Sequence, residues 1–350
     1  MFEIEPSSKA NQQFYKKVSD SFIMPSLIQL EKNIYALVFR LMKLLPARHI
    51  IIEALKNGEI QQDSIIIDTS SGTFALGLGL ICCEMDLKFR IFGDPVIDKN
   101  LIHMLQDLGG DVHLVNKSNN PGAYQKERLK QLHNFMEKES KSFWARQYDN
   151  LNNFNSYACV TEFLLSTLGN NITLIGAVGS GGSTGGIISG IRKKNINAKL
   201  IGVDTFNSVL FGQPDGKRIL RGLGNSIMPK NLHHDLYDEI HWIDANEAFF
   251  YTRWLYKNKG LFCGSTTGAA FQVTSYLASK KSNETFVFIA PDEGYRYLDT
   301  VYNDDWIKIQ GFYNQELTLQ PTKVTHPLEA KPSWSFIAWD RRPYSQVLGV

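Results

Sequence analysis

A loop rich in glycine and hydroxyl residues at positions 179–183 carries the clearest chemistry in this 350-residue chain. It follows the apolar run 174–178 and leads into a pattern typical of a helix. Gly179, Gly181 and Gly182 have no Cβ, so main-chain N–H groups can turn towards an approaching anion. The N-terminus of the expected helix adds unpaired donors and partial positive charge. The loop therefore predicts a phosphate-binding site.

Three classes of phosphate site use loops of this kind. A P-loop nucleotide site needs a lysine after the glycines, and none follows here. A Rossmann dinucleotide site would use Asp204, about 20 residues further on, for a ribose hydroxyl. Against it, Thr184 stands where the third glycine of that motif is needed, and Asp204 also suits a strand end. A pyridoxal-phosphate site is the third class, and other segments of the chain favour it.

The elements around the loop alternate between two patterns. Continuous apolar runs predict buried strands at 64–68, 88–92, 112–115, 143–148, 199–204 and 286–290. Helices are expected at 47–55, 72–85, 99–108, 124–138 and 156–168. This alternation is typical of an α/β fold in which helices cover mostly parallel, twisted sheets. The pattern divides into two runs, which predicts two domains with a cleft between them.

Composition excludes several classes of partner. The net charge of +2 and the lack of a basic run argue against nucleic acid. No apolar stretch reaches the roughly 20 residues of a membrane helix, and the N-terminus lacks the apolar core of a signal peptide. The four cysteines show no metal-binding or redox spacing, which indicates free thiols, no metal site and a reducing, cytoplasmic location.

Four segments together resemble the motifs of the cysteine synthase-like enzymes, which are pyridoxal-phosphate enzymes of fold type II. Residues 179–183 (Gly-Ser-Gly-Gly-Ser) resemble their phosphate loop. Residues 70–75 (Ser-Ser-Gly-Thr-Phe-Ala), 147–150 (Gln-Tyr-Asp-Asn) and 264–268 (Gly-Ser-Thr-Thr-Gly) resemble three further loops of that family. Residues 207–212, 222–224 and 291–306 narrow the resemblance to the N-(2-amino-2-carboxyethyl)-L-glutamate synthases.

This resemblance implies a tryptophan synthase β-like fold and pyridoxal 5'-phosphate as the cofactor. It implies a larger domain from residues 1–44 and 155–310, which binds the cofactor phosphate, and a smaller domain from 45–154. The segment 311–350 loses periodicity and gains proline, so we expect an irregular C-terminal extension there. Members of the family are homodimers.

The implied reaction is a β-replacement on O-phospho-L-serine through an aminoacrylate, with L-glutamate as the attacking amine. Phosphate is released, and the product is a 2,3-diaminopropionate precursor for siderophores and related compounds. A cysteine synthase that uses sulfide is the alternative within the same family. A binding protein that has lost catalysis is the alternative outside it.

The resemblance places the cofactor-binding lysine at Lys43, just before Pro-Ala-Arg-His-Ile at 46–50. Such a lysine forms an imine with the cofactor aldehyde and later handles the α-proton. The family's Asn-Pro-x-Gly-Ser approach to this lysine is missing, because the chain reads Leu-Val-Phe-Arg-Leu-Met at 37–42. The geometry around Lys43 is therefore the open question of this sequence.

The other site residues also follow from the resemblance. Gly179, Ser180, Gly181, Gly182 and Ser183 would hold the cofactor phosphate, Thr266 would meet the pyridine nitrogen, and Thr73 stands where the family has an asparagine beside the cofactor ring. Ser70, Ser71 and Gly72 would bind the substrate carboxylate, with Gln147 as a second ligand. A phosphorylated substrate also needs a cation, for which Arg218, Arg221 and Arg296 are unranked candidates.

Overall fold

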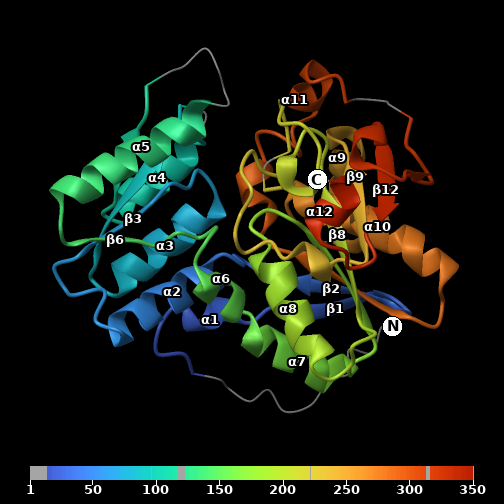
Figure 1. Ribbon diagram of the computed structural model, residues 1–350, viewed down its shortest axis with the longest axis horizontal. Coiled ribbons are helices and arrows are strands. Elements are labelled where there is room, and N and C mark those ends of the chain that lie inside the picture. The colour runs from blue at the N-terminus through green and yellow to red at the C-terminus, as the bar shows by residue number, and fades with distance from the viewer. Residues whose placement is uncertain (1–13, 96, 117–122, 221, 313–315, 350) are drawn as a thin grey trace, which may run out of the picture.

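The computed structural model describes residues 14–95, 97–116, 123–220, 222–312 and 316–349. It contains two sheets with helices on their faces (Figure 1). The large sheet runs in the order β1 (Ser26–Glu31), β2 (Ile34–Val38), β10 (Thr285–Ala290), β7 (Ile172–Ala177), β8 (Lys199–Asp204), β9 (Glu239–Ile243), β12 (Trp334–Ala338) and β11 (Thr322–Lys323). The small sheet runs β5 (Asp111–Leu114), β4 (Lys88–Gly93), β3 (Ile65–Asp68) and β6 (Ser142–Trp144).

Parallel pairing dominates both sheets. Every pair in the small sheet is parallel, as are the pairs from β2 through β10, β7 and β8 to β9. Antiparallel pairs join β1 to β2 and β12 to β9 at the two ends of the large sheet. The predicted α/β fold with mostly parallel sheets is confirmed.

Helices cover both faces of the large sheet. Successive residues of one strand enter different cores: Leu174 joins the cluster under α7 (Ala158–Leu168) and α8 (Gly182–Arg192), whereas Ile175 joins the one under α9 (Ala245–Lys259) and α10 (Ser265–Lys280). This two-sided burial explains why the central strands are continuously apolar.

The small sheet lies on the left in Figure 1, with α3 (Thr73–Glu84), α4 (Lys99–Asp107) and α5 (Ala123–Lys138). Helix α2 (Leu44–Lys56) packs against α3 and joins the cluster under the small sheet. The remaining helices are short: α1 (Asp20–Ile23), α6 (Leu151–Asn155), α11 (Asp304–Ile309) and α12 (Tyr344–Leu348). Within the described ranges, no helix is long and apolar enough to cross a membrane.

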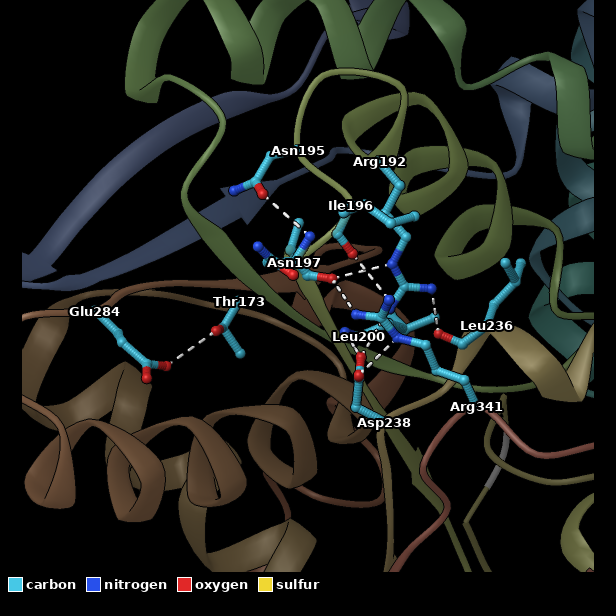
Figure 2. A network of polar contacts seen from close by, with 11 residues as sticks. Thr173, Arg192, Asn195, Ile196, Asn197, Leu200, Leu236, Asp238, Glu284 and Arg341 are labelled. Carbon is cyan, nitrogen blue, oxygen red and sulfur yellow. Dashed lines mark hydrogen bonds and ion pairs between the residues drawn. The ribbon is translucent and has the colours of Figure 1, made fainter.

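The expectation of an irregular C-terminal extension is wrong for the described residues 316–349. Strand β12 pairs with β9, and Trp334 at its start donates from Nε1 to Nδ1 of His241, 3.1 Å away. Arg341 then donates to the carboxylate of Asp238, which Arg192 at the end of α8 also contacts (Figure 2). The strand was missed because five residues between proline-containing turns are too short to show an alternating pattern.

Candidate functional site

The glycine loop connects β7 to α8. Gly181 has a φ of +78°, a left-handed conformation that glycine adopts without strain. A Cβ at this position would lie 2.7 Å from the Cα of Leu232, so the space also excludes a side chain. The first N–H groups of α8 therefore follow a turn that carries no side chain and packs closely against Leu232. A phosphate-binding loop requires main-chain donors presented in this way.

Two further loops meet the first one. A Cβ on Gly179 would meet only the main-chain oxygen of Gly222, at 3.7 Å, and a Cβ on Gly222 would meet Cγ2 of Thr266, at 3.4 Å. The structure thus brings the glycine loop 179–183, the 222–224 segment and the start of α10 together. Gly264 is the N-cap residue of α10, so Thr266 lies in the first turn of that helix.

Thr266 has an unpartnered hydroxyl. Its side chain is buried, and Oγ1 has no hydrogen-bond partner within the described part of the chain. Buried polar atoms are nearly always hydrogen-bonded in native proteins. An orphan hydroxyl at the meeting point of three loops therefore indicates a place for a ligand atom.

Lys43 lies between β2 and α2 and reaches the phosphate loop. Its Nζ is 3.5 Å from Oγ of Ser180, which is a long hydrogen bond. Burial lowers the pKa of Lys43 to about 8, because a desolvated ammonium group is less favourable. The short connection before this lysine is fixed by main-chain hydrogen bonds from Phe39 to Ala290 and from Met42 to Pro291. The shortened approach thus still delivers the amine to the loop.

The predicted carboxylate-binding residues form the turn from β3 into α3. Ser70 is buried, and its Oγ accepts from the N–H of Gly72 at 3.4 Å, while Ser71, Gly72 and Thr73 are half-buried. Helix α3 packs so closely on Lys43 that a Cβ on Gly77 would lie 2.9 Å from the lysine carbonyl oxygen. The turn is therefore on the helix that contacts the lysine segment.

Gln147 lies beyond the end of β6, not within a strand as expected. The strand ends at Trp144, and Arg146 has a left-handed φ of +51°, which breaks the extended conformation. The side chain of Gln147 is buried, and its N–H lies against the carboxylate of Asp68, at the end of β3. The structure therefore brings Gln147 next to the Ser70 turn.

Sequence reasoning missed two buried polar residues beside this turn. Asn153 in α6 donates from Nδ2 to the main-chain oxygen of Gln147 at 2.5 Å and to Oγ of Ser180 at 3.3 Å. Arg128 in α5 is buried, and its Nη1 lies 3.0 Å from a carboxylate oxygen of Asp94, so the two side chains form an ion pair, while Nε has no hydrogen-bond partner within the described residues. Neither residue stands out in the sequence. Asn153 lies among other asparagines, and Arg128 is one of many charged residues in α5.

The three arginines proposed as cations for a phosphorylated substrate differ in what the structure shows of their partners. Arg218 donates to Asp215 at 2.8 Å and also contacts the main-chain oxygen of Asn207 and the hydroxyl of Ser226, so its guanidinium is used within its own loop. Arg221 lies outside the described residues. Arg296 is near the buried carboxylate of Asp292.

The dinucleotide alternative fails on the position of Asp204. This side chain is fully buried, and Oδ1 accepts from the N–H of Thr205 at 2.8 Å. Burial raises its pKa to about 7. A ribose hydroxyl has no access to such a carboxylate, so Asp204 is a strand-end residue of the core.

A buried lysine facing a glycine turn that could bind an anion suits a phosphorylated carbonyl cofactor. The model of the family described as pyridoxal-phosphate dependent enzyme matches residues 40–292, and the chain belongs to that family. It is therefore a pyridoxal-phosphate-dependent enzyme of the transferase and lyase class. The predicted family, enzyme class and cofactor are confirmed.

Two relatives carry the same name. N-(2-amino-2-carboxyethyl)-L-glutamate synthase of Cupriavidus metallidurans is 32% identical over 268 residues, which cover 75% of this chain and 79% of that protein. The protein of that name from Ralstonia nicotianae is 30% identical over 265 residues, covering 75% and 78%.

Solved structures support the fold. A hydrogen sulfide-producing enzyme from Fusobacterium nucleatum has a TM-score of 0.74 at 26% identity, covering 82% of this chain and 99% of that one. An O-acetylserine-dependent cystathionine β-synthase from Helicobacter pylori has a TM-score of 0.77 at 23% identity, covering 83% and 100%. The predicted fold type II architecture is confirmed.

The residues present fit pyridoxal phosphate. The glycine turn at Gly181 offers main-chain donors for a phosphate, and the amine of Lys43 lies beside it. The orphan hydroxyl of Thr266 offers the ring nitrogen a neutral partner. A turn that could bind the phosphate, an amine that could bind the aldehyde and a hydroxyl that could meet the ring nitrogen therefore lie near one another.

Proposed function

We propose that the enzyme catalyses β-replacement on O-phospho-L-serine with L-glutamate as the nucleophile. The C–O bond to phosphate breaks, a C–N bond to the glutamate nitrogen forms, and that nitrogen loses a proton. The products are N-(2-amino-2-carboxyethyl)-L-glutamate and phosphate. Two relatives named for the synthesis of this product support the proposal. The amine of Lys43, held 3.5 Å from Ser180 in the phosphate loop, is the observation that carries the proposal.

Pyridoxal phosphate supplies an electron sink for the carbanion formed at the α-carbon. The chain supplies the proton transfer and the orientation. Because burial lowers the pKa of Lys43 to about 8, its Nζ can both take up and release a proton near neutral pH. The N–H groups and hydroxyls of the Ser70–Gly72 turn would bind the substrate carboxylate at the N-terminus of α3.

We assign the attraction for a phosphorylated substrate to Arg128. Its guanidinium is buried and pairs with Asp94 through Nη1, while Nε has no hydrogen-bond partner within the described residues. Its charge acts on Asp68 and on Tyr148, the residue that follows Gln147 in the chain. A buried cation so close to the carboxylate-binding turn would favour a substrate with a second anionic group.

A cysteine synthase is the second candidate. Solved relatives named for hydrogen sulfide production and for O-acetylserine dependence favour it. A catalytically impaired binding protein is the third reading, because Thr73 replaces the family's asparagine and the approach to Lys43 is shortened.

The test uses the purified protein loaded with pyridoxal phosphate. We expect a visible absorption band that borohydride bleaches and that Lys43→Ala removes. O-phospho-L-serine and O-acetyl-L-serine are then each supplied with L-glutamate or with sulfide, and the product is identified by mass spectrometry. Cysteine as the main product would favour the second candidate. A protein that forms the band but turns over neither donor would favour the third.

Three further attributes belong to the same proposal. We expect the product to serve 2,3-diaminopropionate and siderophore-type biosynthesis, the enzyme to be a homodimer, and its location to be the cytoplasm. Small-angle scattering or mass photometry of the loaded enzyme measures the oligomeric state directly.

A further inference from the structure

Asn153 joins two of the loops that form the site. The side chain is fully buried in α6, between the 147–150 segment and the phosphate loop. Its Nδ2 donates to the main-chain oxygen of Gln147 at 2.5 Å and to Oγ of Ser180 at 3.3 Å. One amide group therefore connects the substrate-binding side with the cofactor-binding side.

The orientation of this amide is fixed by its partner. A main-chain carbonyl only accepts, so the amide nitrogen must face Gln147. The oxygen then points at the start of α8, where a Cβ on Gly182 would lie 2.4 Å from Oδ1. This Oδ1 has no hydrogen-bond partner in the part of the chain that is described.

The hydroxyl of Ser180 is surrounded by donors. Asn153 and Lys43 approach Oγ at 3.3 and 3.5 Å, and the N–H of Gly182 approaches it at 3.4 Å. A serine oxygen has two lone pairs and one proton. With its lone pairs directed at these donors, the proton of Ser180 must point away from them.

We propose that Asn153 is a positioning residue that makes the Ser180 hydroxyl a hydrogen-bond donor to the cofactor phosphate. By holding the oxygen of Ser180 as an acceptor, the amide turns the Ser180 proton towards the anion site. The same amide ties the Gln147 main chain to the loop, so both halves of the site share one anchor. The inference rests on the proposed role of residues 179–183 as the phosphate loop.

Asn153→Asp reverses the polarity of this contact. A carboxylate would accept the Ser180 proton and place a negative charge near the phosphate. Asn153→Ala only removes the donor. We therefore expect Asp to be worse than Ala, with affinity for pyridoxal phosphate reduced about 100-fold and about tenfold respectively. A purely structural role would also make Asp worse, because a buried carboxylate would face the main-chain oxygen of Gln147, so the comparison needs a ligand without the phosphate.

Pyridoxal, which lacks the phosphate, isolates the effect. We expect its affinity to change less than about threefold in both Asn153 variants, since the missing contact is to the phosphate. Asn155→Asp, an exposed position at the end of the same helix, is the matched control and should bind both ligands as the parent does. Equal losses for pyridoxal and pyridoxal phosphate, or wild-type affinity in Asn153→Asp, would overturn the inference.

Ser180→Ala separates this inference from the site assignment. If that variant binds pyridoxal phosphate as tightly as the parent, the Ser180 hydroxyl does not donate to the phosphate and the inference is wrong, while the loop assignment still rests on main-chain donors and is tested by Gly181→Ala. If the Asp variant does not fold, the double variant Asn153→Ala with Ser180→Ala replaces it. In the Ser180→Ala background, Asn153→Ala should cause no further loss of affinity, whereas additive losses contradict the proposed coupling.

Discussion

The amine of Lys43 lies 3.5 Å from the hydroxyl of Ser180, although 137 positions separate the two residues in the sequence. Lys43 follows β2, the strand next to the edge strand β1 of the large sheet, and Ser180 follows β7, a central strand of the same sheet. The contact joins the residue predicted to react with the cofactor to the loop predicted to hold its phosphate. The amine is buried at this contact, and that burial desolvates it in the folded protein.

Replacing Lys43 with methionine should stabilise the cofactor-free protein at neutral pH. The pKa of Lys43 falls from 10.5 to about 8 on folding, so the unfolded chain binds this proton more tightly. Below pH 8 the folded state carries the full cost of the buried charge, about 3 kcal/mol, and the cost disappears as the pH rises to 10.5. Lys43→Met should therefore raise the free energy of unfolding at pH 7 and much less at pH 10.

Urea unfolding at the two pH values measures this difference. Lys56→Met, at an exposed lysine at the other end of α2, is the control. The prediction fails if the two variants have the same stability at pH 7.

Gly181→Ala should abolish tight cofactor binding. Alanine at a φ of +78° is strained by about 1 kcal/mol, and its Cβ would also strike the main chain at Leu232. Gly260→Ala is a matched control, because that glycine is also left-handed, with a φ of +69°, but has open space around it. We expect both variants to lose stability in thermal unfolding, and only Gly181→Ala to lose affinity for pyridoxal phosphate in equilibrium dialysis. Equal affinity in the two variants would contradict the predicted phosphate site.

Thr266→Val should stabilise the cofactor-free protein while weakening cofactor binding. Valine removes the orphan Oγ1 without a change of shape, which we expect to gain about 1 kcal/mol of unfolding free energy. Thr274→Val, in the same helix, removes a hydroxyl that donates to the Ala270 carbonyl at 2.7 Å and should give no such gain. Denaturant unfolding without cofactor and titration with cofactor measure the two effects. A loss of stability in Thr266→Val would mean that the hydroxyl already has a partner.

Arg128→Gln should raise the KM for O-phospho-L-serine at least tenfold and that for O-acetyl-L-serine far less. The reason is the loss of a buried cation that only the phosphorylated substrate needs. Arg90→Gln removes an arginine that pairs with Asp111 on the small sheet and serves as the control. Steady-state kinetics with both donors decide the matter, and parallel increases in both KM values would argue for a structural role.

Strands buried on both faces were predictable because their signal is local. The run 199–204 was placed with its observed bounds, since both faces are covered and every residue is apolar or at an end. Strand β12 and Asn153 were not predictable for the opposite reason. The strand depends on β9 for its pairing, and the asparagine depends on a serine 27 positions away. The role of each is set by a partner distant in sequence.

The short connection before Lys43 has a thermodynamic consequence. Hydrogen bonds from Phe39 and Met42 to the end of β10 fasten both sides of this connection, so its main chain has few alternative conformations before any ligand arrives. Ordering a flexible loop costs about 1–2 kcal/mol per residue, and a preorganised one avoids most of that loss. Because the connection is shorter than in the family motif, the entropic cost of ordering it is met when the chain folds. Little of that cost then remains when the cofactor binds.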